Sequence, residues 1–348
     1  MARVDAFNKG RAEKDDEYYT RYEDIQSEIN HYEEHFRDKV VLCNCDDPFE
    51  SNFCKFFLKN FNYLGLKRLI CTSYFSSPVL GMQLSLFDEE EKPLKVGNAY
   101  VLDISEVPMA NGRGVSDDDI DKLLKSEKRG VKKLSGDGDF RSSECLEYLK
   151  QADLVVTNPP FSKFIEFVST LISYKKQFLI IGRETAVSYK EVFPLLKENK
   201  IWFGYTHAKE FYRPDGTTKK FGNVLWYTNL DVEKRHEDII LYKTYDAEEY
   251  PKYENFEGID VACVTDIPKD YDGVMGVPVS FMNSYNPDQF EIIGYGKGKL
   301  GQEIGVTGIK PEHKKKMKNH SAAGDLYYIQ NNGSPKTPFA RMLVKRKK

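Results

Sequence analysis

The sequence predicts an α/β protein built on a doubly wound, mostly parallel sheet that also carries an antiparallel hairpin. Short apolar runs rich in β-branched residues recur through residues 39–228, and helical patterns separate most of them. Strands that are buried on both faces have such continuous apolar runs, and parallel strands need crossover connections, which are usually helices. Right-handed crossovers place the loops after the strands along one sheet edge, where ligands bind.

The expected elements follow from these patterns in chain order. The predicted strands are 39–45, 68–72, 153–157, 177–182, 200–204 and 223–228. The first predicted helix is 21–36, because Ile25, Ile29, Tyr32 and Phe36 recur at helical spacing. Further helices are predicted at 51–64, 142–150, 161–174 and 188–199. The polar stretch 206–221 contains a Pro-Asp-Gly turn, so the last two strands are expected to form the antiparallel hairpin.

Two parts of the chain depart from this alternation. Residues 73–135 form a long insertion, with a predicted strand from Ala99 to Ile104 and a helix that Ser116 and Asp119 would cap. Residues 231–348 are rich in Pro, Gly, Tyr and Lys and lack the strand–helix rhythm. The predicted organisation is therefore a flexible arm (1–14), a sheet domain (15–230) and a recognition region with a basic tail (231–348).

Composition excludes several protein classes. The 348 residues are 40% apolar and 13% aromatic, which is too much for a disordered chain. No apolar run reaches 18 residues, and the first residues lack the apolar region of a secretory signal. We therefore expect a cytoplasmic protein without a membrane partner.

The charge is unevenly distributed along the chain. The formal net charge is −3, but residues 295–348 hold 13 Lys and Arg against 3 Asp and Glu, which leaves −13 for the remainder. Such asymmetry favours a polyanionic partner for the basic end. A flexible solubilising tail is the alternative, and composition alone does not separate the two.

The cysteines do not indicate a metal site. The 6 cysteines contain no C-x-x-C pair. Cys43 and Cys45 lie on one face of a predicted strand, and His31 and His35 lie four residues apart on a predicted helix, but this spacing does not match common zinc sites. Buried structural thiols are the favoured interpretation, and no metal is expected.

The most specific local signal is the tetrapeptide Asn158-Pro159-Pro160-Phe161, which directly follows a predicted buried strand. Two prolines stiffen the backbone and remove two N–H donors. The Asn158 side-chain oxygen and the Pro159 carbonyl could then accept hydrogens from an exocyclic amino group, while Phe161 stacks on its ring. The alternative is a rigid turn in which Asn158 only caps the following helix.

This tetrapeptide resembles the [DNS]-P-P-[YF] signature of S-adenosylmethionine-dependent amino methyltransferases. Asp16-Glu17-Tyr18-Tyr19-Thr20 resembles their N-terminal cofactor motif, with Arg21 in place of the usual proline, and Gly138-Asp139-Phe140 is similar to their cofactor-adenine turn. Further stretches resemble the EcoRI-type adenine methyltransferases, a group with the gamma order of sequence motifs. These stretches are 44–48, 136–144, 156–162, 189–193, 228–232 and 273–278. These matches extend over about four-fifths of the chain, from 16 to 290.

The resemblance implies a fold, a reaction and a set of residues. The fold would be a class I, Rossmann-like methyltransferase domain. The enzyme would be a site-specific, adenine-specific DNA methyltransferase that transfers a methyl group from S-adenosylmethionine to N6 of a flipped-out adenine in double-stranded DNA. The catalytic residues would be Asn158, Pro159, Pro160 and Phe161, and the cofactor-binding residues would be Tyr19, Thr20, Asp46, Asp47, Asp139, Phe140 and Asn158.

One stretch departs from the wider methyltransferase pattern. The usual glycine-rich loop after the first strand is replaced by a stretch that contains Asp46 and Asp47, and no acidic residue closes the second strand. EcoRI-type proteins share both features. Either aspartate could bind the ribose hydroxyls or the methionine ammonium, and the sequence does not decide between them.

The resemblance also implies a setting for the enzyme. It would be a bacterial protein, or one encoded by a phage or plasmid, that acts as a monomer. It would belong to a restriction–modification system or act as an orphan methylase. The DNA recognition sequence does not follow from the residues.

Three other functions are compatible with parts of the pattern. Glutamine methyltransferases share the tetrapeptide but carry the glycine-rich loop that is missing here. An RNA N6-adenine methyltransferase is the main alternative. A non-catalytic DNA-binding relative is disfavoured because the tetrapeptide is intact.

A further segment suggests a second partner. Gln83-Leu84-Ser85-Leu86-Phe87 resembles the peptide by which bacterial replication and repair proteins dock on the sliding clamp. A buried amphipathic segment of the insertion is the favoured alternative.

Overall fold

The computed structural model describes residues 18–74, 99–108, 114–125, 131–213, 217–317 and 322–347. The chain divides into two compact units. The first unit comprises Met1–Thr185 and Phe203–Leu230, and the second comprises Ala186–Trp202 and Asp231–Lys348. The sequence did not indicate that the segment 186–202 groups with the C-terminal residues.

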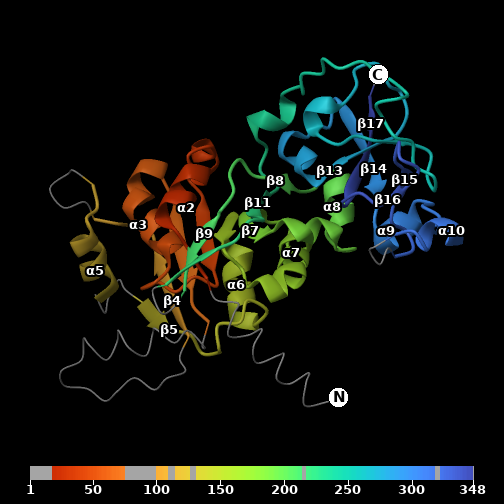
Figure 1. Cartoon of the computed structure of the whole chain (residues 1–348). Coiled ribbons are helices and arrows are strands. Elements are labelled where there is room, and N and C mark those ends of the chain that lie inside the picture. The colour runs from red at the N-terminus through yellow and green to blue at the C-terminus, as the bar shows by residue number, and fades with distance from the viewer. Residues whose placement is uncertain are drawn as a thin grey trace, which may run out of the picture. The chain divides into compact units, whose positions relative to one another are not determined.

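The first unit is organised by four parallel strands with buried apolar side chains (Figure 1). They are β2 (Val40–Asn44), β3 (Arg68–Thr72), β6 (Leu154–Thr157) and β7 (Gln177–Arg183). The sheet order is β5-β4-β3-β2-β6-β7-β11-β8, so the chain proceeds from β2 to one side through β3 and to the other side through β6. This reversal places the ends of β2 and β6 side by side, where open α/β sheets bind their ligands.

Further strands flank the parallel centre on both sides. β4 (Tyr100–Ile104) is antiparallel to β3, and β5 (Val131–Lys133) is antiparallel to β4. β11 (Val224–Thr228) is antiparallel to β7 and neighbours β8 (Trp202–Phe203). The sheet is therefore mixed, and the expected mostly parallel character holds only at its centre. Apolar runs report the burial of a strand but not its direction, so the pattern could not reveal these antiparallel neighbours.

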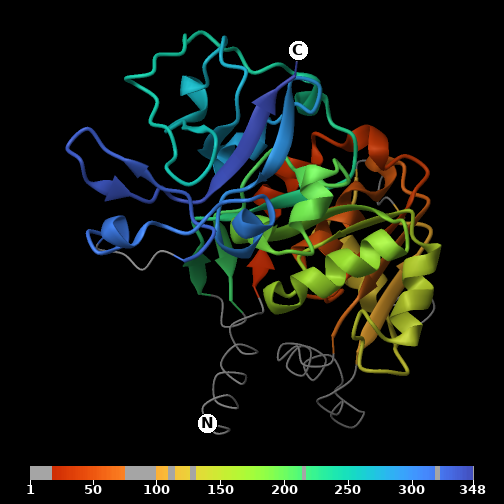
Figure 2. The same cartoon turned by 90° about the vertical axis from the view of Figure 1, so that its right-hand side faces the viewer.

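Helices cover both faces of this sheet. α2, α3 and α5 lie on one face, and α6 and α7 lie on the other (Figures 1 and 2). α3 (Asn52–Leu64) begins where the Ser51 hydroxyl accepts from the Phe53 N–H, and it ends at Gly65 with φ +64°. α6 (Ser143–Gln151) is capped in the same way by Ser142. α7 (Phe164–Ser173) follows the short 3₁₀ helix η4 (Phe161–Lys163).

Two predicted helices are shorter in the structure. α2 (Tyr22–Ile29) ends where the Tyr32 N–H bonds to the Ile29 carbonyl, and the chain continues as the 3₁₀ helix η1 (Glu33–His35). α8 (Phe193–Lys197) starts late because Pro194 is tolerated only in the first helical turn. The apolar periodicity nevertheless identified buried side chains, because Ile25 and Phe36 are both fully buried.

The insertion contributes both elements that were predicted for it. β4 is the predicted strand, and α5 (Asp117–Lys125) is the predicted helix. The Ser116 hydroxyl and the Asp119 carboxylate form a reciprocal capping box, in which the Asp119 N–H donates to Ser116 Oγ over 3.2 Å and the Ser116 N–H to Asp119 Oδ2 over 3.0 Å. The clamp-like peptide 83–87 lies outside the described residues.

A small second sheet belongs to the first unit. β1 (Tyr19–Thr20), β9 (Glu210–Tyr212) and β10 (Thr218–Lys220) form an antiparallel sheet in the order β1-β9-β10. The stretch 206–221 is therefore more than a polar connection between two strands. It carries a hairpin that pairs with the N-terminal motif.

The second unit is built around a four-stranded sheet in the order β12-β13-β17-β14. Its strands are β12 (Ile259–Asp260), β13 (Met275–Pro278), β17 (Arg341–Arg346) and β14 (Phe290–Tyr295). A two-stranded hairpin of β15 (Tyr328–Ile329) and β16 (Pro335–Lys336) and the helices α9 (Gly298–Glu303) and α10 (Pro311–Lys314) complete the regular elements. Among the described residues, the short 3₁₀ helix Glu233–His236 precedes β12, and the 3₁₀ helices Val264–Asp266 and Val279–Ser284 lie between the strands. Among the described residues, no helix of either unit could cross a membrane.

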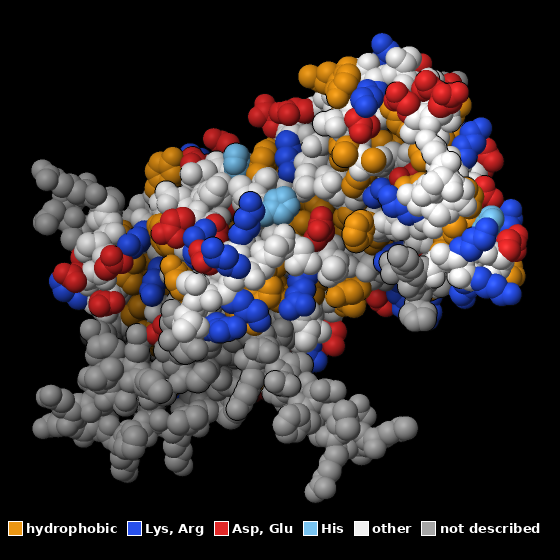
Figure 3. Space-filling view, viewed as in Figure 1, with side chains coloured by type: hydrophobic (Ala, Val, Ile, Leu, Met, Phe, Trp, Pro, Cys, Tyr) orange, Lys and Arg blue, Asp and Glu red, His pale blue; other side chains and the backbone are white. Residues whose placement is uncertain are grey.

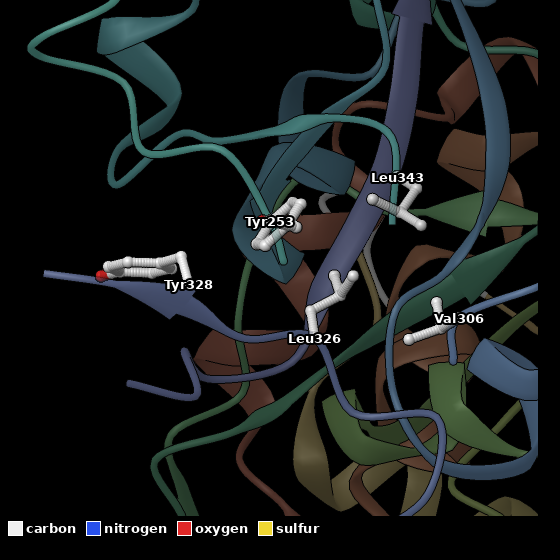
Figure 4. Close-up of a cluster of buried hydrophobic side chains, with 5 residues drawn as sticks. All are labelled: Tyr253, Val306, Leu326, Tyr328 and Leu343. Atoms are coloured by element: carbon white, nitrogen blue, oxygen red, sulfur yellow. The ribbon is translucent and has the colours of Figure 1, made fainter. Parts of the chain in front are cut away.

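The C-terminal strand corrects the expectation of a basic tail. β17 is a central strand of the second sheet, and Leu343 belongs to a buried cluster with Tyr253, Val306, Leu326 and Tyr328 (Figure 4). Arg341 is buried and forms an ion pair with Asp260, with Nε 2.9 Å from Oδ1. Arg341 is therefore a core residue, because the Asp260 carboxylate compensates its charge inside the sheet.

Candidate active site

The loop after β6 holds Asn158 in one defined orientation. Its side-chain Nδ2 donates to the Tyr18 carbonyl over 2.7 Å. Its Oδ1 is buried and has no hydrogen-bond partner among the described residues. An unsatisfied buried acceptor costs about 1–3 kcal/mol, so such an atom in a loop at the ligand-binding edge indicates a missing donor.

The structure also decides against the capping interpretation of Asn158. The N-cap of the 3₁₀ helix η4 is Pro160, and no side chain caps that helix. The Lys163 N–H donates to the Pro160 carbonyl over 2.9 Å, so the first turn is closed by the backbone. The Asn158 amide oxygen is therefore available to a ligand.

Phe161 belongs to an aromatic cluster that joins the loop after β6 to the small sheet of β1, β9 and β10. Its ring lies 6.5 Å from the Tyr18 ring in a nearly parallel arrangement, with an interplanar angle of 27°. Its other neighbours are Phe211 and Phe221, at 6.5 Å and 6.1 Å and with nearly perpendicular planes. Phe211 is fully buried, whereas Phe161 is only partly buried.

Two cations lie against this aromatic cluster. The Arg183 guanidinium is 5.0 Å from the Phe161 ring centroid, and the Lys219 ammonium is 5.1 Å from that of Tyr18. Lys219 Nζ also donates to the Tyr18 hydroxyl over 2.8 Å. Sequence reasoning missed Phe211, Phe221, Arg183 and Lys219. The aromatic residues at both ends of the stretch 211–221 were the available signal.

Asp46 links the loop after β2 to the end of β6. Its Oδ2 accepts from the Thr157 hydroxyl over 2.5 Å, and its Oδ1 accepts from the Ser51 hydroxyl over 2.7 Å. Burial raises the pKa of Asp46 to about 7, although both of these hydrogen bonds oppose the rise. The site therefore contains a buried carboxyl group without a cation in contact with it among the described residues.

Other polar groups of this loop and of β1 are also buried. Asp47 is 5% exposed, and its Oδ1 accepts from the Phe49 N–H over 2.8 Å, which closes the turn. Thr20 is 2% exposed, and its carbonyl accepts from Asn52 Nδ2 over 2.8 Å. Thr20 Oγ1 and Glu50 Oε1 are buried without hydrogen-bond partners among the described residues. Tyr19 pairs with Tyr212 of β9 in the same small sheet.

The turn Gly138-Asp139-Phe140 passes over the end of β3. A Cβ on Gly138, whose φ is +76°, would lie 2.0 Å from the Ser73 carbonyl oxygen, so only glycine permits this approach. The Asp139 carboxylate is paired with Arg141, with Nη2 2.6 Å from Oδ2, and this interaction lowers the pKa of Asp139. The Phe140 ring is 4% exposed and packs edge-on against Phe167 at 5.0 Å.

The predicted site residues therefore fall into two groups. Asn158 and Phe161 are joined directly to Tyr18, and Asp46 is joined to the end of β6. Asp139 and Phe140 belong to the turn at the end of β3 instead, where Asp139 pairs with Arg141 and Phe140 packs on Phe167 of α7. Asp16 and Glu17 lie outside the described residues.

The site can orient a bound molecule, but its described residues include no evident nucleophile. Cys43, Cys54 and Cys71 are buried in the core, and burial raises the pKa of Cys43 to about 11. No group of three potential metal ligands occurs among the residues that the structure describes. What the site offers is a neutral acceptor oxygen, a partly exposed ring with cations beside it, and a buried carboxyl group. These groups can hold a planar molecule by its amino group.

Comparison with known proteins identifies the relatives of this chain. The family model described as adenine-specific methyltransferase EcoRI matches residues 6–347. The type II methyltransferase M.EcoRI of Escherichia coli is 43% identical over 332 residues, which cover 90% of this chain and 95% of that protein. M.MgeORF184P of Mycoplasma genitalium and M.MpnI of Mycoplasma pneumoniae, also type II methyltransferases, are each 35% identical, cover 82% of this chain, and are covered over 85% and 84% of their lengths. No solved structure matches.

Proposed function

This chain belongs to the EcoRI family of adenine-specific methyltransferases, and on that basis we propose that it methylates N6 of an adenine turned out of duplex DNA, with S-adenosylmethionine as methyl donor. The buried, unpartnered oxygen of Asn158 carries the proposal. An N6 amino group offers the donor that this oxygen lacks. The Tyr18 carbonyl keeps the amide from rotating, so the acceptor is oriented before the base arrives.

The chain's residues would bind and aim the adenine. A base inside the duplex cannot reach a loop of this kind, so it must be turned out at a cost of a few kcal/mol. Phe161 would recover part of this cost by stacking, because it is partly exposed and its ring is held by Tyr18. Asn158 Oδ1 and the Pro159 carbonyl would accept the two N6 hydrogens, which leaves the nitrogen lone pair directed out of the ring plane.

The methyl transfer itself requires no covalent enzyme intermediate. S-adenosylmethionine, when bound, supplies a methyl group on a positively charged sulfur. With the donor bound, the N6 lone pair would form the new bond to its methyl carbon, the carbon–sulfur bond pair would stay on sulfur, and N6 would then lose one proton to water. Asn158 would stabilise the positive charge that develops on N6, since its oxygen is a preorganised dipole.

The residues present are compatible with this donor. The donor's ammonium group would compensate the buried Asp46 carboxylate, which lacks a cation among the described residues. Thr20 Oγ1 and Glu50 Oε1 are further buried polar atoms without a hydrogen-bond partner in the described part of the chain, and both belong to segments that adjoin Asn52. We assign the ammonium to Asp46 and the remaining cofactor contacts to Tyr19, Thr20, Asp47 and Asp139. Phe140 would support the turn from within the core.

We propose that residues 15–230 form a class I, Rossmann-like catalytic domain and that residues 231–348 recognise DNA. The order of the four central strands, with its reversal between β2 and β6, supports the first assignment. The second compact unit, which contains all of the residues after Leu230, supports the second. We further propose that the enzyme acts as a monomer.

One experiment tests the function as a whole. The purified protein is incubated with unmethylated duplex DNA and S-adenosylmethionine, and the modified positions are mapped by single-molecule sequencing. N6-methyladenine at a defined short sequence is expected. Methylation of single-stranded RNA in preference to duplex DNA would replace this proposal with an RNA methyltransferase.

A further inference from the structure

The hairpin β15–β16 of the second unit carries an exposed amide at its tip. The loop between Ile329 and Pro335 is closed by hydrogen bonds from the Gln330 N–H to the Ser334 carbonyl over 2.9 Å and from the Gly333 N–H to the Gln330 carbonyl over 2.8 Å. The hairpin extends away from the four-stranded sheet in Figure 2. Its tip therefore has a defined backbone conformation while remaining open to solvent.

Hydrogen bonds inside the loop involve two of its three amide side chains. Gln330 Nε2 donates to the Ser334 hydroxyl over 3.0 Å, and Asn332 Oδ1 accepts from the Ser334 N–H over 3.0 Å. The third, Asn331, is exposed and has no side-chain hydrogen bond to any described residue. The loop is thus internally braced and presents a single free amide group, which has one acceptor and two donor hydrogens.

Exposed lysines lie beside this hairpin. α10 continues into a turn that ends at Met317, and Lys314, Lys315 and Lys316 on it are all exposed. Lys336, on β16, is exposed as well. Figure 3 shows Lys and Arg side chains gathered at the end of the second unit where Figure 1 labels α10.

Both ends of the hairpin contact the lysine segment. His313 Nδ1 lies 3.2 Å from the hydroxyl of Tyr327, which directly precedes β15. The Thr337 hydroxyl, directly after β16, lies 3.8 Å from the sulfur of Met317. These two contacts enclose Lys314–Lys316 between them, so the lysines are held at the base of the hairpin.

The nearby acidic groups do not cancel this positive charge. Glu254 is paired with Lys310 at 3.2 Å, and Glu312 is the acidic residue within α10 itself. Lys314–Lys316 and Lys336 together carry four positive charges, and none of the four has an ion pair with a described residue. Such a set of exposed lysines matches the phosphates of a nucleic acid.

We propose that this hairpin enters the major groove of duplex DNA, that Asn331 reads a base edge there, and that Lys314–Lys316 hold the flanking phosphates. A two-stranded β-ribbon fits the major groove, and an amide side chain matches N6 and N7 of adenine with two hydrogen bonds. The proposal rests on the proposed function, because it names the residues by which the methyltransferase selects its site.

Two variants of the full-length enzyme test the two parts of the proposal. Asn331→Ala is expected to lower the preference for the methylated sequence over single-base variants of it by roughly 5- to 150-fold at one position, with unchanged S-adenosylmethionine binding. Asn30→Ala, an exposed asparagine of the first unit, is the matched control. Affinity for DNA falls as the salt concentration rises. The triple change of Lys314, Lys315 and Lys316 to alanine is expected to make the slope of log affinity against log salt concentration shallower, by about 1 for each lysine that contacts a phosphate.

The lysine control removes the same charge from the same unit. The triple change of Lys252, Lys269 and Lys345 to alanine alters three exposed lysines elsewhere and should leave the slope nearly unchanged. Equal slopes for the two triple variants, or wild-type sequence preference in Asn331→Ala, would overturn the proposal while the wild-type enzyme still methylates adenine. If the wild-type enzyme methylates no DNA, it is the proposed function that fails.

Discussion

The Asn158 side-chain nitrogen donates to the Tyr18 carbonyl over 2.7 Å, across 140 residues of sequence. This bond determines which way the amide faces, because exchanging its nitrogen and oxygen would place two acceptors against each other. The amide oxygen is consequently left buried and without a partner among the described residues. Besides the cofactor contact proposed for it, the N-terminal motif thus orients the acceptor of the proposed reaction.

Replacement of Asn158 by alanine removes this acceptor. We expect Asn158→Ala to lower the rate of methyl transfer by about 10²–10³-fold, because the preorganised dipole next to N6 is lost. Binding of S-adenosylmethionine should change little. Incorporation of radiolabelled methyl groups into DNA measures the first quantity, and calorimetric titration measures the second.

Asn62→Ala is the matched control for this variant. Asn62 Nδ2 donates to the Val107 carbonyl over 3.0 Å, so its removal also breaks an amide–carbonyl bond, but at a distance from the loop after β6. Wild-type turnover in Asn158→Ala would contradict the mechanism.

The protonation of Asp46 should make cofactor binding depend on pH. With a folded-state pKa of about 7, the carboxyl group is mostly neutral below neutral pH, and a cationic ligand favours its ionised form. Affinity for S-adenosylmethionine should therefore rise with pH and level off above 7, and it should be about tenfold weaker at pH 6 than at pH 8. Asp46→Asn should flatten this dependence, which isothermal titration at several pH values would detect. A wild-type affinity independent of pH would exclude this role.

The same raised pKa has the opposite consequence for stability without ligand. The ordinary pKa of an aspartate is 3.8, so between about pH 4 and 7 the folded chain keeps a proton that the unfolded chain has lost. The contribution of Asp46 to the free energy of unfolding should therefore fall as pH rises through this range. Urea denaturation of the wild type and Asp46→Asn, compared at pH 5 and pH 8, measures this difference. If the difference in free energy of unfolding between the two proteins were the same at both pH values, this expectation would be wrong.

The ring of Phe161 should affect base flipping more than it affects folding. We expect Phe161→Ala to weaken the flipped state by about 1–3 kcal/mol, the usual loss when a base loses its stacking partner. Fluorescence of 2-aminopurine at the target position reports this state directly. Phe161→Tyr keeps a ring and should behave nearly as the wild type, whereas equal flipping by the alanine and tyrosine variants would refute the stacking role.

The glycine of the turn over β3 should tolerate no side chain. Gly138→Ala would place a methyl group 2.0 Å from the Ser73 carbonyl oxygen at a positive φ. We therefore expect its free energy of unfolding to be lower than that of the wild type by about 1–3 kcal/mol or more. Gly136→Ala is the control, because its nearest atom would lie 3.8 Å away. Urea denaturation compares the two, and similar stabilities would show that the close approach is not maintained.

The ion pair between Arg341 and Asp260 should matter for stability and not for DNA contact. Arg341→Ala leaves a carboxylate that is 4% exposed without its cation, which should cost about 3–5 kcal/mol. Lys345→Ala, an exposed position on the same strand, should change the free energy of unfolding by less than about 0.5 kcal/mol. If Arg341→Ala weakened DNA binding at full stability, the assignment of Arg341 to the core would be wrong.

Features that depend on neighbouring residues could be predicted from the sequence. The buried strands, the helix starts at Ser51 and Ser142 and the capping box of Ser116 and Asp119 were all anticipated. Each depends on residues within a few positions of one another, so the local pattern contains the information. The residues of the loop after β6 were identified for the same reason, because the tetrapeptide is contiguous.

Features that depend on residues far apart in the sequence could not be predicted in this way. The charge count grouped Arg341 with exposed lysines, although its partner Asp260 lies 81 residues away. The stretch 206–221 was interpreted as a polar connection, because nothing local shows that Phe211 and Phe221 meet Phe161. Likewise, apolar runs identified the strands but not their antiparallel neighbours.

By itself, the sequence determined which strands are buried and where most helices begin, and it singled out the loop after β6 as the proposed site, because these follow from periodicity and contiguous motifs. Only the tertiary structure decided that the Asn158 oxygen is buried without a hydrogen-bond partner among the described residues, that Asp46 is buried without a cation among them, and which basic residues are exposed. The physical reason is that orientation, desolvation and charge pairing depend on groups brought together from distant parts of the chain.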